Sequence, residues 1–270
     1  MTDSLIDPLR PVVPQLLQLR SPAEYAEWLR TARISAPLRL FESSALEHLT
    51  WTAWWLIPCA WLPVAAALLA HAAAAPAGGP SPYAMSALFA AGVVCWSLFE
   101  YAMHRFVFHA APAANGPSIA VSFLLHGVHH VTPRDEGRLV FPPAPAAAIA
   151  ALLFASFRAL LSESVVSTAS FCVIFAGGIV GYVAYDVLHF ALHHCCSMDL
   201  PVGAAVRSTF SALQARHLAH HARGDANFGV TSPLWDRVFS TGTSSKLSGD
   251  EGRMQGAAVP VVEPSTSSAE

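Results

Sequence analysis

Eleven of the thirteen histidines lie in four short stretches, HRFVFH (104–109), HGVHH (126–130), YDVLHFALHH (185–194) and RHLAHH (216–221). Histidine is the side chain that most often binds metal ions, and it is rarely clustered for packing alone. Within three of the stretches the spacing is i, i+3 or i, i+4, which places imidazoles on one face of a helix. These groups can form one site only if the rest of the chain brings them together, so they decide how the fold is interpreted.

The composition is that of a membrane protein. Hydrophobic residues make up 54% of the 270 residues and charged residues only 12%, whereas a soluble domain carries about 25% charge. The formal net charge of −3 gives no indication of nucleic-acid binding. The five cysteines form no CxxC pair and no even-numbered framework, which argues against a disulfide scaffold.

Four apolar runs are candidates for membrane spans, at about residues 51–75, 83–103, 145–161 and 165–188. A span needs about 20 apolar residues, which all but the third run supply, so the third is marginal and could be tilted or re-entrant. With four spans every histidine group falls at the same membrane face, whereas two or three spans would divide the groups. The sequence therefore predicts an all-α integral membrane protein, with about four transmembrane helices and a helical cap that holds a histidine-rich di-metal site.

The distribution of positive charge orients this bundle. Of the 15 Lys and Arg residues, all but Arg158 lie outside the two loops on the face away from the histidines. Positively charged residues favour the cytosolic side of a membrane. We therefore expect a multi-pass protein whose termini and metal site are cytosolic.

Three regions are expected along the chain. Residues 1–50 form a cytosolic N-terminal segment with an interfacial helix, which begins at the capping-box pattern Ser21-Pro22-Ala23-Glu24. Residues 51–242 form the membrane domain that carries the histidines. Residues 243–270 are rich in Ser, Gly and Pro and are expected to be disordered.

Ten imidazoles are too many ligands for one metal ion, but they supply about five to each of two ions. Five ligands leave one octahedral position open for oxygen or water, whereas a structural zinc site is closed with four ligands. Imidazole suits several transition metals, and the count favours a catalytic pair, most simply two irons. The expected ligands are His104, His109, His126, His129, His130, His189, His193, His217, His220 and His221.

Other residues near the histidines are candidates to orient the imidazoles and to offset the charge of the metals. This second set comprises Glu100, Asp135, Asp186, His194 and Asp236. An ordinary salt bridge, for instance between Asp135 and Arg138, is an equal alternative for Asp135 and Asp236. His104 and His109 are five residues apart, so either the helix ends between them or they serve different metals.

Four blocks of the chain resemble the fatty acid 2-hydroxylases of the membrane fatty acid hydroxylase superfamily. They are HRFVFH (104–109), HGVHHVTPRDEGRLVFPP (126–143), GYVAYDVLHFALHH (181–194) and HLAHHARGDANFGVTSPLWDRVFSTG (217–242), and the similarity extends over about residues 7–242. The resemblance implies that the membrane domain is a fatty acid hydroxylase domain and that the ten histidines hold two irons, which zinc could replace in a purified protein. It also implies an endoplasmic reticulum enzyme that uses molecular oxygen to α-hydroxylate the acyl chains of ceramides or free fatty acids.

Many members of that family carry an N-terminal cytochrome b5 domain. The first fifty residues are too few to build one, so we expect a separate cytochrome b5 and its reductase to supply electrons. Polar residues near the histidines are candidates to hold the lipid head group: Arg138, Asn227, Thr231, Ser232 and Trp235. Interfacial anchoring and loop capping are the alternative for these five, and the one we favour. Gly229 is a candidate for a turn that needs a positive φ.

Two other functions compete with this interpretation. One is a sterol or carotenoid oxidase or a desaturase of the same superfamily, against which RLVFPP (138–143) and FGVTSPLWDRVF (228–239) argue. The other is a metal-transport membrane protein. Its ligands would lie near the bilayer midplane within broken helices, whereas the histidines here fall at the ends of the spans.

Overall fold

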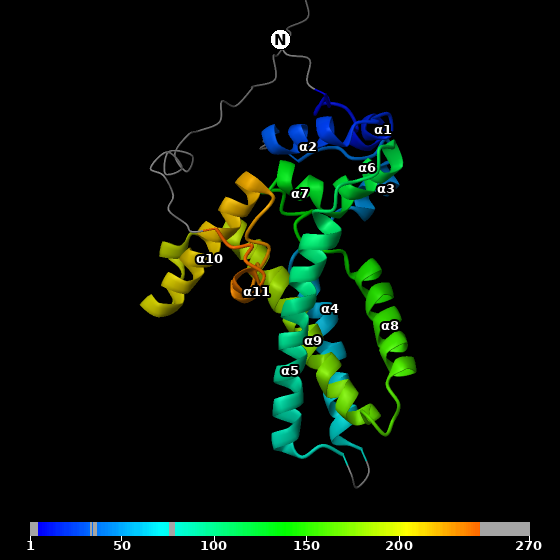
Figure 1. Cartoon of the computed structure of the whole chain (residues 1–270), viewed down its shortest axis with the longest axis vertical. Helices are drawn as coiled ribbons and strands as arrows, with labels where there is room; N and C mark the ends of the chain where they lie inside the picture. Colours follow the sequence, from blue (N-terminus) through cyan, green and yellow to red (C-terminus); the bar gives the residue numbers. More distant parts are fainter. Residues whose placement is uncertain (1–4, 33, 35–36, 76–78, 244–270) are drawn as a thin grey trace, which may run out of the picture.

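The computed structural model describes residues 5–32, 34, 37–75 and 79–243, and Figure 1 shows the path of the chain. Within these ranges the chain forms helices and no strand. The elements are α1 Val12–Leu16, α2 Pro22–Thr31, α3 Ser44–Leu49, α4 Leu56–Ala73, α5 Pro82–Met103, η1 His104–Phe108, α6 Gly116–Ser122, η2 Phe123–Gly127, α7 Val128–Val131, α8 Pro143–Leu160, α9 Thr168–His194, η3 Ser197–Asp199, α10 Ala204–Arg223 and α11 Leu234–Val238. Of these, η1 and η2 are π-helices and η3 is a 3₁₀-helix. The tail predicted at 243–270 lies outside the described residues except for Thr243.

Four helical segments are long and apolar enough to cross a membrane, at Leu56–Ala73, Pro82–Phe108, Pro143–Leu160 and Thr168–His194. They coincide with the four predicted runs to within a few residues at most ends, so the prediction of an all-helical membrane protein with four spans is confirmed. The third run, predicted as marginal, forms the 18-residue helix α8, which runs alongside the other three in Figure 1. Ser81 and Ser167 cap the second and fourth spans by accepting backbone hydrogen bonds.

The helix α9 packs against both α4 and α5. Where α9 crosses α5, glycines bring the two backbones together: a Cβ on Gly92 would lie 2.0 Å from the carbonyl oxygen of Ile174, and one on Gly177 would lie 2.2 Å from that of Phe89. Small residues allow this close approach where lipid offers no hydrophobic drive for association. The crossing fixes the direction in which α5 and α9 present the histidines at their ends.

A cap of short helices closes the end of the bundle at which α5 and α9 carry their histidines (Figure 1). The helix α2 begins as predicted, with the Ser21 hydroxyl accepting a hydrogen bond from the Glu24 N–H at 3.2 Å. Its apolar face, which the sequence assigned to the membrane surface, is buried on protein: Tyr25 and Trp28 pack in one core with Phe123 and other cap residues. The N-terminal segment and the histidine-bearing segments therefore share a core.

All four histidine stretches lie at this capped end, as the parity of four spans predicted. They occupy η1 with the residue after it, η2 with α7, the end of α9 and the C-terminal half of α10. The membrane scaffold thus delivers side chains that are more than a hundred residues apart to one place.

Candidate metal centre

The ten predicted histidines form two adjacent groups of five. Within each group the candidate ligand atoms all lie within 4.8 Å of one another. The first group consists of His104, His109, His126, His130 and His220, and the second of His129, His189, His193, His217 and His221. The groups touch, since the rings of His130 and His221 stack with centroids 4.3 Å apart. Each group is thus a set of nitrogen donors that could hold one metal ion.

The spacing of the histidines determines the group to which each belongs. In both HGVHH and RHLAHH, the first and last histidines are an i, i+4 pair and share a group, as do His189 and His193. The histidine at i+3 joins the other group in each case: His129 in the first stretch and His220 in the second. On a helix the i+3 and i+4 positions lie on either side of residue i, so one stretch serves two groups.

A π-helix brings His104 and His109 into the same group. The N–H of His109 donates to the carbonyl oxygen of His104 at 3.1 Å, which is the i→i+5 bond of a π-turn. With about 4.4 residues per turn, residues five apart lie about 50° apart around the helix axis, compared with about 140° on an α-helix. Of the two alternatives offered for this pair, the first is confirmed, because η1 ends at Phe108 and His109 is the residue after it. The second was wrong, because the two rings share one group.

The distances between ring nitrogens suit a metal ion better than a hydrogen-bond network. The Nε2 atom of His217 lies 3.0 Å from that of His189, 2.7 Å from that of His193 and 3.1 Å from that of His221. One ring proton cannot satisfy three such contacts. Nitrogens bound at about 2.1 Å and at right angles to one ion lie about 3.0 Å apart. In the first group, Nε2 of His109 and of His220 are buried without a hydrogen-bond partner, as unliganded metal-binding atoms would be.

Burial keeps the cap imidazoles neutral, which is the form that binds metal. It lowers the pKa of His109 to about 3 and that of His220 to about 4, from a usual value of 6.5. Burial first, and neighbouring imidazoles second, lower the pKa well below 6.5 for His126, His129, His217 and His221. Their lone pairs are therefore available at neutral pH.

Two backbone carbonyls orient rings of the first group. The carbonyl oxygen of Phe228 lies 2.6 Å from Nδ1 of His104, and that of Ala226 lies 2.8 Å from Nδ1 of His220. A proton on Nδ1 that donates to a carbonyl leaves Nε2 as the free lone pair, so these contacts fix both tautomer and ring direction. We call residues 226–231 the carbonyl loop.

Glu100 and Asp236 hold the carbonyl loop from two sides. Glu100 accepts hydrogen bonds from the N–H groups of Val230 and Thr231, both at 2.9 Å. Asp236 accepts from the N–H groups of Phe228 at 2.9 Å and Gly229 at 3.0 Å. Both acids were predicted to orient imidazoles directly. In the structure they bind the backbone of the carbonyl loop, and the carbonyl oxygens of that loop orient the imidazoles.

Gly229 belongs to this loop for a reason other than the one predicted. Among the described glycines only Gly224 has a positive φ, of 74°, at the end of α10. At Gly229 a Cβ would lie 2.2 Å from the carbonyl oxygen of Ser232. The prediction of a positive φ at Gly229 was therefore wrong, and glycine is needed there because the chain folds back closely on itself.

The other members of the second set make contacts with residues other than the ten histidines. Asp135 pairs with Arg138 at 2.7 Å, which is the salt bridge given as its alternative. Asp186 is buried in the bundle and accepts a hydrogen bond from the Phe141 N–H at 3.4 Å. His194 stacks on Phe190 with ring centroids 4.4 Å apart and belongs to neither group of five.

The five candidate head-group residues all make contacts within the protein. Arg138 bonds to Glu47, Asp135 and Thr50. Asn227 bonds to Thr243, and the Thr231 hydroxyl donates to Glu100 at 2.6 Å. Ser232 accepts from the Leu234 N–H, and the Trp235 indole donates to the Ser97 hydroxyl at 3.0 Å. These contacts agree with the anchoring and capping roles that we favoured.

The carbonyl oxygens of Ala226 and Phe228 are the parts of the site that sequence reasoning missed. A backbone carbonyl is present at every residue, so no residue type indicates it. The available signal was Gly229, because glycine is the usual residue at a tight turn or a close approach of the backbone.

Comparison with known proteins assigns the family. The fatty acid hydroxylase family model matches residues 89–241. The chain is 39% identical over 239 residues to a dihydroceramide fatty acyl 2-hydroxylase of Arabidopsis thaliana, covering 87% of this chain and 92% of that one. It is 33% identical over 260 residues to the fatty acid 2-hydroxylase of Homo sapiens, covering 90% and 66%.

The fold agrees with this assignment. A solved structure of full-length Scs7p, in which only the hydroxylase domain is visible, superposes with a TM-score of 0.76 at 36% identity. The match covers 88% of this chain and 86% of that one. The chain belongs to the fatty acid hydroxylase family.

Proposed function

We propose that this chain is an oxygen-dependent di-iron monooxygenase that hydroxylates C2 of the fatty acyl chain in ceramides, other sphingolipids or free fatty acids. The observation that carries the proposal is the pairing of two five-imidazole groups at one end of a four-span bundle. The names of the relatives, which are dihydroceramide fatty acyl and fatty acid 2-hydroxylases, support the reacting position and the substrate class.

Each group of five would hold one iron, and zinc could replace iron in purified protein. The donor set supports this assignment, because neutral imidazole suits both metals and five nitrogens leave one octahedral position open. When bound, such a pair supplies the redox chemistry that side chains lack, namely activation of molecular oxygen for insertion into an unactivated C–H bond. The C–H bond becomes C–OH and the second oxygen atom becomes water, with two electrons and two protons consumed.

The side chains of this protein have positioning tasks in that reaction. Burial keeps the rings neutral, and the carbonyl loop fixes His104 and His220. Glu100 and Asp236 hold the loop rigid through backbone N–H groups, as outer contacts of metal ligands do in other proteins. The four spans let an acyl chain approach this end of the bundle from lipid.

The two electrons require a donor, for which we propose a separate cytochrome b5 with its reductase. We place the protein in the endoplasmic reticulum membrane, with the termini and the histidine groups on the cytosolic face. The scarcity of Lys and Arg in the loops at the other end of the bundle, where Arg158 is the exception, supports this orientation. We also propose that residues 51–242 are the hydroxylase domain, with the buried face of α2 completing its cap.

Lipid mass spectrometry tests the activity. Cells that lack 2-hydroxy sphingolipids should accumulate them when they express the full chain. The substitution His129→Ala should abolish the product, because it removes a buried ligand of the second group, while the protein stays in the membrane. His48→Ala is the matched control, since His48 is exposed and belongs to neither group.

Metal analysis tests the centre independently of turnover. Purified protein should contain about two transition-metal ions per chain, and His129→Ala should contain fewer. One ion or none in the native chain, or normal 2-hydroxylation by His129→Ala, would contradict the proposal.

A further inference from the structure

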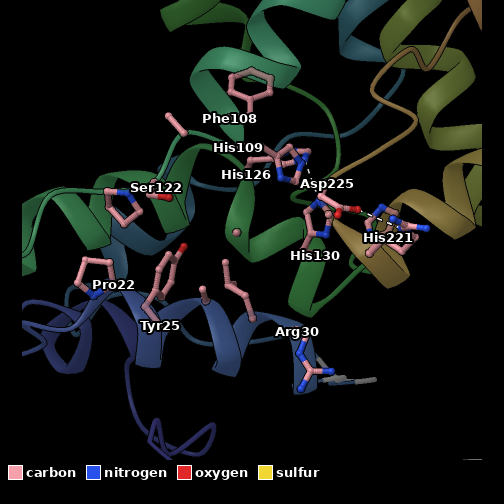
Figure 2. Close-up of a pocket in the computed structure, with 18 of the residues that line it drawn as sticks. Pro22, Tyr25, Arg30, Phe108, His109, Ser122, His126, His130, His221 and Asp225 are labelled. Carbon is pink, nitrogen blue, oxygen red and sulfur yellow. Dashed lines mark hydrogen bonds and ion pairs between the residues drawn. The ribbon is translucent and has the colours of Figure 1, made fainter. Parts of the chain in front are cut away.

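A cavity of about 370 Å³ reaches the histidine groups from the cap. It lies between α2, the end of η1, η2 and the C-terminal end of α10, as Figure 2 shows. Four of the ten rings line it. Three are from the first group, His109, His126 and His130, and the fourth is His221 of the second group. Ligand pockets usually have volumes of about 300–1,000 Å³, so this one is large enough for part of a lipid. The function proposed above gave this cavity no role.

Most of the other cavity walls are apolar. Ala26 and Leu29 come from α2, and Phe108, Ala111 and Pro112 come from the end of η1 and the residues after it. Such walls suit methylene groups. A ligand here would be mainly hydrocarbon where it meets the metal-binding groups.

Two uncharged hydroxyls interrupt the apolar walls. Figure 2 shows the Tyr25 hydroxyl pointing from α2 toward Ser122, and both residues line the cavity. Tyr25 is 2% exposed, and within the described residues its buried hydroxyl approaches the Ser122 side chain but forms no hydrogen bond of good geometry. An unsatisfied buried hydroxyl costs about 1–3 kcal/mol, so a ligand that accepts its hydrogen bond would remove this penalty. Burial raises the pKa of Tyr25, which keeps the hydroxyl protonated as a donor.

Gly127 of the HGVHH stretch makes room for this hydroxyl. A Cβ at Gly127 would lie 2.5 Å from the Tyr25 oxygen. The Tyr25 hydroxyl therefore rests on the backbone one residue from His126, a ring of the first group. This contact sets a polar donor against the backbone of the HGVHH stretch, which carries three of the ten histidines.

We infer that the cavity is the binding site for the start of the acyl chain, in which the Tyr25 and Ser122 hydroxyls hydrogen-bond to the C1 carbonyl oxygen of the substrate. The inference rests on the proposed 2-hydroxylation and deepens it. C1 is one bond from C2, so a substrate whose C2 meets the metals must place its carbonyl oxygen beside them. Hydroxyls that hold this carbonyl oxygen would fix which carbon is presented, which makes Tyr25 and Ser122 determinants of regiospecificity.

The charges at the cavity mouth favour an amide-linked acyl chain. Arg30 and Arg223 line the cavity, and each has an acidic partner: Glu27 at 2.6 Å and Asp225 at 3.1 Å. The two pairs balance in charge, so the mouth offers no net positive field for a carboxylate or a polyphosphate. An uncharged N-acyl amide head group of the ceramide class fits this mouth better than a free acid or an acyl-CoA.

Kinetic analysis of Tyr25→Phe tests the inference, because this change removes the hydroxyl and keeps the ring that packs on Trp28. Membranes with the full chain and its electron donors would receive a ceramide, a free fatty acid and an acyl-CoA with the same acyl chain, in separate arms. We expect kcat/KM for the ceramide to fall about tenfold, and a 3-hydroxy product to appear beside the 2-hydroxy product. Metal content should be unchanged, and the wild type should prefer the ceramide arm.

Ser122→Ala should lower kcat/KM for the ceramide by a smaller factor. If Tyr25→Phe loses metal or stability, the result for Ser122→Ala decides whether the inference holds. Tyr83→Phe is the control, since Tyr83 is 87% exposed at the opposite end of α5. Unchanged kcat/KM and an unchanged product position in both cavity variants would overturn the inference, and a preference for free acid or acyl-CoA would overturn its amide specificity. A wild type that forms no 2-hydroxy product from any substrate would instead overturn the proposed function on which it rests.

Discussion

Glu100 accepts two hydrogen bonds from Thr231, one from the backbone N–H at 2.9 Å and one from the hydroxyl at 2.6 Å. The two residues are 131 positions apart, and the bond joins the second span to the carbonyl loop. The next link is the contact of the Phe228 carbonyl oxygen with His104, at 2.6 Å. A carboxylate that touches no ring thereby determines where a ring points.

The substitution Glu100→Gln should weaken metal binding by the first group about 10- to 100-fold. Glutamine keeps the shape of the side chain, but its NH₂ group cannot accept one of the bonds that Glu100 accepts. Metal content after dialysis against a chelator measures the effect, and one ion should be lost before the other. Glu163→Gln is a matched control, because Glu163 accepts the same kinds of bond from Thr168 at the other end of the bundle. Equal metal retention by both variants would contradict the role of the loop.

The four spans, and the location of all histidine groups at one end of the bundle, could be predicted because both depend on local sequence patterns. A run of about 20 apolar residues determines a span wherever it occurs. The predicted second span, 83–103, therefore differs by one residue from α5, Pro82–Met103. Four spans then leave one possible face for all the histidine groups, whatever the details of packing.

The parts that could not be predicted depend on partners far away in the chain. The amphipathic pattern of α2 shows that one face is buried, but not whether lipid or protein buries it, and Tyr25 and Trp28 face protein. The π-turn at His104 could not be predicted, because local spacing alone favours an α-helix and π-turns are rare. The partners of Glu100 lie in the carbonyl loop. This loop has no helical periodicity in its sequence from which its position could be predicted.

Gly229→Ala should destabilise the protein by about 1–3 kcal/mol, because the new Cβ would overlap the Ser232 carbonyl oxygen and shift the carbonyl loop. Thermal unfolding and metal content should fall together. Gly178→Ala is the control, since a Cβ at Gly178 would meet its nearest atom at 3.9 Å, an ordinary contact. A change in Tm of equal size in both variants would show that the close approach at Gly229 is unimportant.

Acid should remove the metals before it unfolds the membrane spans. The pKa of His109 is lowered to about 3 and that of His220 to about 4, against 6.5 in the unfolded chain. Above pH 6.5 these rings are neutral in both the folded and the unfolded protein. Below pH 6.5 the rings bind protons in the unfolded chain but not in the folded cap. The free energy of unfolding therefore falls by about 1.4 kcal/mol per pH unit for each such ring. Metal content and cap protection against proteolysis, measured from pH 8 to pH 4, should drop below pH 6.5. Full metal retention at pH 4 would contradict this.

Two neighbouring glycines in α9 should respond differently to the same change, one with a loss of stability and metal and the other with almost no effect. A Cβ on Gly177 would lie 2.2 Å from the carbonyl oxygen of Phe89, whereas one on Gly178 would meet its nearest atom at 3.9 Å, an ordinary contact. Gly177→Ala should therefore push α5 away from α9, separating His104 from the rings that α9 carries, and should lower both Tm and metal content. Gly178→Ala should leave both near the wild-type values, since alanine also favours the helix. If the two variants behaved alike, the close crossing of α5 and α9 would not be what aligns the histidines.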